Sequence, residues 1–137
     1  MTRNALAAVL LLTSLGCASS LTGPAKTAAL GQPLDLGVGE SARISDQLLE
    51  LRFDGVGSDS RCPIDVVCIQ AGDAELRLTA RRPPATEFSL NLHTELARSS
   101  ATFQGFEIAL LELRPHPKAG EPIMPSQYVA TLKVTRP

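Results

Sequence analysis

The sequence predicts an all-β protein, a single antiparallel β-sandwich of the immunoglobulin-like kind with six or seven strands. From residue 34 onward, apolar residues alternate with polar ones in short runs, which is the pattern of half-buried strands. No segment of this region has a helical period of useful length. Strands with one apolar face must bury those faces against one another, in two packed sheets or a small barrel. We favour the sandwich.

The first element is a signal peptide, a helix predicted over residues 1–16. Arg3 precedes an apolar run of about eleven residues, well short of the roughly 20 that a permanent membrane span needs. Cys17 follows Gly16 directly behind this run, and the placement resembles a bacterial lipobox, in which the cysteine becomes the lipidated first residue. Diacylation with an acylated amine, palmitate being the typical chain, would anchor the protein stably in a membrane.

The residues after Cys17 bear on where the protein resides. Ala18 is not an aspartate, so the resemblance implies lipid anchoring in the outer membrane, facing the periplasm, if the organism has two membranes. Ordinary cleavage after Ser19 would instead release a secreted or periplasmic protein. Residues 17–33 are small and polar and contain Gly and Pro, which predicts a flexible tether between the lipid-anchored cysteine and a β-sandwich domain over 34–137.

Composition excludes several classes of partner. About 121 residues remain after cleavage, enough for one domain, and they carry 12 basic and 14 acidic residues without a long run of either sign. This balance leaves no electrostatic footprint for nucleic acid. Four Phe, one Tyr and no Trp offer few stacking platforms, which disfavours glycan and single-strand binding.

Six alternating runs define the predicted strands, over 34–44, 48–56, 73–82, 88–94, 105–115 and 128–135. The residues expected to face the core are Leu34, Leu36, Val38, Leu49, Leu51, Phe53, Ala74, Leu76, Leu78, Ala80, Phe88, Leu90, Leu92, Phe106, Ile108, Leu110, Leu111, Leu113, Tyr128, Ala130, Leu132 and Val134. In the fifth run the apolar phase shifts by one residue. A β-bulge near Leu110–Leu111 would absorb this shift.

The remaining two cysteines, Cys62 and Cys68, stand in the loop "DSRCPIDVVCIQAG". Lipidation of Cys17 leaves an even pair in an exported chain, which favours a disulfide. The C-x5-C spacing is not that of a C-x-x-C redox motif. A zinc or copper site would need both thiols reduced and a distant histidine, although an envelope protein with metal or thiol-redox chemistry at this pair is an alternative.

Catalysis, cofactors and metals are not expected. The chain has only two histidines, and it lacks the G-x-S-x-G, H-E-x-x-H and Gly-rich phosphate-loop motifs. His93 falls on the polar side of its strand, as a solvated surface residue would, and His116 lies between two prolines in a loop. Asp54, Asp59, Asp65 and Asp73 surround the cysteines, but they lack the calcium-loop register.

Two loops are candidate binding loops. Their candidate residues are Arg61, Pro63, Asp65 and Gln70 in the cysteine loop, and Pro115, His116 and Pro117 in the loop "RPHPKAGEPIMPSQ". Four prolines stiffen the second loop, which lowers the entropy cost of presenting it to a partner. We therefore expect a membrane-anchored, non-catalytic binding module with an envelope protein as partner, and a protease-inhibitor-like module is a further alternative.

The cysteine motif also carries a resemblance. "DSRCPIDVVCIQAG", with "GFEIALLELRPHP" and "YVATLKVTR", is similar to a family of small, uncharacterised bacterial secreted proteins and lipoproteins that share a DSRCPxxVxCxxAG signature. The likeness covers most of the mature domain. It implies an exported all-β domain and no known activity. An aromatic residue, usually Trp, often stands in that family where this chain has Gln70.

Overall fold

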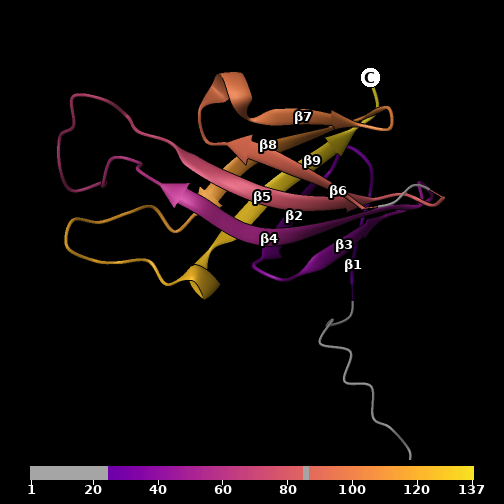
Figure 1. The fold of residues 1–137 in the computed structure, drawn as a ribbon, viewed down its shortest axis with the longest axis horizontal. Helices are drawn as coiled ribbons and strands as arrows, with labels where there is room; N and C mark the ends of the chain where they lie inside the picture. The colour runs from indigo at the N-terminus through magenta and orange to yellow at the C-terminus, as the bar shows by residue number, and fades with distance from the viewer. Residues whose placement is uncertain (1–24, 85–86) are drawn as a thin grey trace, which may run out of the picture.

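Strands dominate the computed structural model, which describes residues 25–84 and 87–137 (Figure 1). The predicted signal peptide and Cys17 lie outside the described residues. The strands are β1 (Lys26–Ala28), β2 (Pro33–Gly37), β3 (Ser41–Ile44), β4 (Leu49–Asp59), β5 (Ala74–Arg81), β6 (Phe88–His93), β7 (Ser100–Phe103), β8 (Phe106–Arg114) and β9 (Val129–Thr135). Two short 3-10 turns, η1 (Leu96–Arg98) and η2 (Pro125–Gln127), interrupt the loops. No helix in the described part of the chain is long and apolar enough to cross a membrane.

These strands form two sheets, with the orders β1-β3-β4-β5-β6 and β2-β9-β8-β7. The all-β prediction is confirmed. Every pair is antiparallel except β1 with β3, which is parallel and departs from the antiparallel prediction.

The predicted number of six or seven strands was too low. Gly39, with φ +83°, turns the single run predicted over 34–44 into β2 and β3, which belong to different sheets. The short strands β1 and β7 bury at most one side chain each, Phe103 in β7. They therefore lack the apolar alternation by which strands are found in a sequence.

Part of the segment predicted as a flexible tether, residues 26–33, is paired with the sheets. Lys26–Ala28 pair with β3, and the Gly31 amide donates to the Val134 carbonyl at 2.7 Å. Residues 26–33 are thus held by backbone hydrogen bonds, because an edge strand can add to a sheet through its main chain without apolar side chains. The flexible-tether prediction was wrong for this part.

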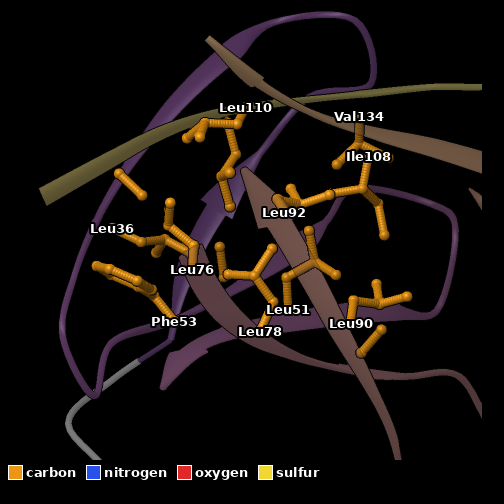
Figure 2. Close-up of a cluster of buried hydrophobic side chains, with 14 of the residues drawn as sticks. Leu36, Leu51, Phe53, Leu76, Leu78, Leu90, Leu92, Ile108, Leu110 and Val134 are labelled. Atoms are coloured by element: carbon orange, nitrogen blue, oxygen red, sulfur yellow. The ribbon is translucent and has the colours of Figure 1, made fainter. Parts of the chain in front are cut away.

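A single apolar core takes side chains from both sheets (Figure 2). Leu51, Phe53, Leu76 and Leu78 come from one sheet, and Ile108 from the other is equally inaccessible to solvent. All of these residues were predicted to face inward from the period-two pattern.

The predicted bulge is confirmed in β8. Its register with β9 shifts between Leu110 and Glu112, so that Leu110 and Leu113 both face the core. Leu111 was expected to face inward but is 52% exposed, because the bulge turns its side chain outward.

Phe88 is a second exception to the predicted core. It is 54% exposed, and its ring stacks on Phe103 with the centroids 5.8 Å apart. Phe88 begins the edge strand β6. The first two residues of β6 are exposed, and the first buried residue of this strand is Leu90.

Candidate functional site

Both loops singled out from the sequence lie at one end of the molecule, seen on the left in Figure 1. We call residues 60–73, between β4 and β5, the disulfide loop. We call residues 115–128, between β8 and β9, the proline loop. Together they form the two-loop end, and three hydrogen bonds described below join them.

Cys62 and Cys68 are joined by a disulfide, with their Cα atoms 6.0 Å apart, which confirms the predicted pairing. The Ser60 amide donates to the Asp73 carbonyl at 2.7 Å, and the Cys62 amide donates to the Ala71 carbonyl at 2.8 Å. The β4–β5 hairpin thus continues to the base of the disulfide. With the sulfurs bonded to each other, neither is available as a thiolate ligand.

Gly72 is required where the hairpin closes. Its φ is +70°, and a Cβ on it would collide with the Ser60 carbonyl oxygen. Only glycine satisfies both conditions without movement of the backbone. The glycine at the end of the cysteine motif therefore has a steric reason.

Arg61 was predicted as a residue of an exposed binding loop, but it is buried, at 8% exposure. Its guanidinium donates to both carboxylate oxygens of Asp59, at 2.8 and 2.6 Å. It also donates to the Leu113 carbonyl at 2.7 Å and to the Pro115 carbonyl at 2.9 Å. The planar fork of arginine can serve several acceptors at once, so this one side chain ties the disulfide loop to the end of β8 and to the proline loop.

Tyr128 completes this buried cluster by donating to Asp59 Oδ2 at 3.0 Å. Desolvation by burial raises the pKa of Asp59, but hydrogen bonds and charge from Arg61 outweigh it, so the pKa lies below its ordinary value. Burial, followed by the hydrogen bond to Asp59, raises the pKa of Tyr128. The carboxylate is therefore held ionised within its cluster.

Two further hydrogen bonds join the loops. The Ile64 amide donates to the Pro117 carbonyl at 3.0 Å, and the Ala119 amide donates to Asp65 Oδ1 at 2.8 Å. Asp65, predicted as a binding residue, thus holds the proline loop in place. Pro63, Pro115 and Pro117 are half-buried, whereas Gln70 and His116 are exposed.

The disulfide loop exposes four aliphatic side chains that were not among the predicted binding residues. The exposed fractions are 64% for Ile64, 43% for Val66, 101% for Val67 and 105% for Ile69. Met124, in the proline loop, is 61% exposed. The available signal was four β-branched residues in a loop otherwise built of turn residues. A loop with no apolar neighbours to bury them must leave them in water.

A small cavity of about 190 Å³ lies beside this end. Arg61, Leu111 and His116 are among its lining residues, so the bulge on β8 forms part of its wall. A larger cavity of about 550 Å³ is lined by Ile44, Leu48 and neighbouring residues at the opposite end of β4.

His93 is half-buried and hydrogen-bonded, contrary to its prediction as a solvated surface residue. Its Nδ1 lies 2.6 Å from Asp73 Oδ2, and Thr94 Oγ1 and the Glu95 amide each donate to Asp73 Oδ1 at 3.0 Å. Burial raises the pKa of Asp73, but these hydrogen bonds, that of His93 foremost, lower it to about 2. Arg98 Nη1 lies 3.5 Å from His93 Nε2 and is the one side-chain partner recorded for that atom within 25–84 and 87–137.

The four aspartates around the cysteines are separated. Asp54 pairs with Arg52, and Asp59, Asp65 and Asp73 have the different partners given above. Within the described residues, no group of three or more His, Cys, Asp or Glu side chains is arranged to hold a metal ion. Each of the four aspartates instead pairs with an arginine side chain or accepts a hydrogen bond from a backbone amide.

The fold and site define an all-β protein of two sheets with a disulfide-braced pair of loops at one end. The chain matches no protein-family model, no curated protein and no solved structure.

Proposed function

We propose that this chain is a non-catalytic binding module of the bacterial cell envelope, folded as an immunoglobulin-like β-sandwich and anchored by lipid on Cys17. The two-loop end is its binding face. The observation that carries this proposal is the exposure of Ile64, Val66, Val67 and Ile69 on a loop that is held rigid from beneath. Several exposed apolar side chains gathered on one loop of a stable scaffold favour an interaction site.

The sandwich is supported by the two sheets and by the core that both contribute to. Sandwich domains present loops at their two ends and commonly use them for binding. The two loops at one end of this chain match that arrangement. The resemblance to small exported proteins with the DSRCPxxVxCxxAG signature is part of the same proposal.

An exported location is supported by the disulfide, because oxidising compartments are where such bonds form and persist. The apolar run before Cys17 supports export through a signal peptide, and Cys17 directly behind it supports the lipid anchor. In an organism with two membranes we propose the outer membrane, facing the periplasm.

The non-catalytic assignment is supported by the partners of the two histidines. His93 is engaged by Asp73 and Arg98, with no hydroxyl or thiol among its recorded partners in the described residues. His116 lies exposed in the proline loop, with no recorded side-chain hydrogen bond in that part of the chain. A nucleophile and its base need to lie within hydrogen-bond reach, and this arrangement does not supply such a pair. Metal or thiol-redox chemistry at Cys62 and Cys68 is the less supported alternative, because it requires the bonded sulfurs to be reduced.

Photo-cross-linking in the cells that make the protein tests the proposal. A photoreactive residue is placed at Gln70 in the disulfide loop or Met124 in the proline loop, with Leu48 as the matched control. Leu48 is 75% exposed. It precedes β4, whereas the disulfide loop follows β4, so Leu48 lies at the opposite end of that strand. We expect adducts from the two loop positions and none from Leu48. Equal adducts at all three positions, or none from either loop, would overturn the proposal.

A further inference from the structure

We infer that the partner is a protein with a concave, uncharged apolar pocket, and that Val67 and Ile69 are the side chains that enter it. This inference rests on the proposed function and names the chemistry of its partner.

The shape of the tip of the disulfide loop, residues 66–70, favours a concave partner. Val67 and Ile69 are 101% and 105% exposed, so their side chains project with essentially no cover from the protein itself. A flat surface would cover only one side of such projecting groups. A pocket that surrounds them would remove their whole apolar surface from water, which is where hydrophobic affinity arises.

The stiffness of the tip favours a preformed pocket. Before the tip, Arg61, Ile64 and Asp65 are hydrogen-bonded to the proline loop. After it, the Ala71 carbonyl accepts from the Cys62 amide, and the disulfide joins Cys62 to Cys68 within the tip, so the backbone is held on both sides. All four exposed side chains are β-branched, and such side chains have restricted χ1 freedom. Little conformational entropy is therefore lost when they are buried, so shape complementarity translates into affinity.

The charges of the tip distinguish a protein pocket from other surfaces. Between Cys62 and Gly72 the sole charged residue is Asp65, and its carboxylate accepts the Ala119 amide. An anionic membrane or a nucleic acid attracts clusters of Lys and Arg, which this segment lacks. It also lacks the Trp and Tyr that anchor proteins at membrane interfaces and stack on sugars. A neutral aliphatic knob is complementary to a neutral aliphatic pocket.

The experiment compares adduct yield in cells from a photoreactive residue at Gln70 in three backgrounds. These are the unmodified chain, the double variant Val67→Thr with Ile69→Thr, and the control Leu48→Thr. Threonine retains the branched shape at position 67 while adding a hydroxyl that an apolar pocket cannot satisfy. Because all three positions are exposed, disulfide formation and thermal unfolding of the purified variants should match those of the parent.

We expect a protein adduct whose yield falls at least about tenfold in the double variant and is unchanged in Leu48→Thr, since two buried aliphatic groups are lost. A protein adduct of unchanged yield in the double variant would overturn the inference and leave the proposed function standing. A lipid adduct, recognised by a mass increase below that of any protein, would overturn the inference in favour of a membrane surface. Failure of both loop positions to cross-link would overturn the proposed function itself.

Discussion

The guanidinium of Arg61 donates to both carboxylate oxygens of Asp59, and both side chains are nearly inaccessible to water, at 7% and 9% exposure. The same guanidinium donates to the Leu113 and Pro115 carbonyls, and Tyr128 donates to Asp59. A charge pair this deeply buried is costly unless every polar atom is satisfied, and among the described residues no buried side-chain nitrogen or oxygen is left without a hydrogen-bond partner. The two loops are therefore held together by a complete buried polar cluster.

Removing Arg61 should destabilise the whole domain. Arg61→Ala leaves the Asp59 carboxylate buried without its counter-ion and frees two backbone carbonyls, so we expect a loss of about 3–5 kcal/mol in the free energy of unfolding. Urea denaturation followed by circular dichroism measures this. Arg81→Ala is the matched control, because its pair with Glu50 is half-exposed and should contribute less than about 1 kcal/mol. Similar losses in the two variants would contradict the role of the cluster.

Gly72→Ala should be more damaging than alanine at another left-handed glycine. Gly31 has φ +79° and open space around its missing Cβ, so Gly31→Ala should cost only the conformational strain of about 1–2 kcal/mol. Gly72→Ala adds a collision with the Ser60 carbonyl, and we expect a loss of at least about 3 kcal/mol or failure of the disulfide to form. Thermal unfolding and thiol titration read out both effects. Equal losses at the two positions would show that the hairpin accommodates the methyl group.

Opening the disulfide should destabilise the protein by a smaller amount. In the chain-entropy model a seven-residue loop contributes about 2–2.5 kcal/mol through the unfolded state. We expect this loss in Cys62→Ser with Cys68→Ser, measured by urea denaturation. The core should persist, because the sheets do not depend on the loop for their packing. A double variant as stable as the parent would mean that the loop is braced entirely by its hydrogen bonds.

Acid should weaken the protein through Asp73. Its pKa is about 2 in the fold against an ordinary 3.8, so the carboxylate contributes stability above about pH 5. That contribution declines as the pH falls through 3.8 and is lost below about 2. Since the side chain is a quarter exposed, solvent screening reduces the effect to about 1 kcal/mol. Denaturation from pH 6 to pH 2 should show this drop in the parent, and a smaller drop in Asp73→Asn. Parallel pH profiles would contradict the assignment.

Much of the core could be predicted from the sequence because burial in a strand has a period of two. Leu51, Phe53, Leu76 and Leu78 alternate with polar neighbours, and all four are buried. The bulge in β8 could be predicted for the same reason, as a break in that period. The prediction that Phe88 faces the core was wrong, because alternation does not reveal where a strand extends past the core.

The roles of the site residues could not be read in the same way. Arg61 and Asp65 stand in a polar, Pro-containing stretch and looked like surface residues. Arg61 has Asp59 as a near partner, but the partners that join the two loops to each other and to β8, among them Leu113 and Ala119, are more than 50 positions away in the chain. No local pattern encodes a hydrogen bond across that separation.

By itself, the sequence determined the all-β class, most of the core and the pairing of Cys62 with Cys68, because alternation and cysteine count are local properties of the chain. Only the tertiary structure decided that Arg61 is a buried brace and that Val67 and Ile69 stand free at the tip. Burial depends on which distant segments arrive beside a residue. The hairpin that carries these side chains extends beyond the core, where no described segment covers them.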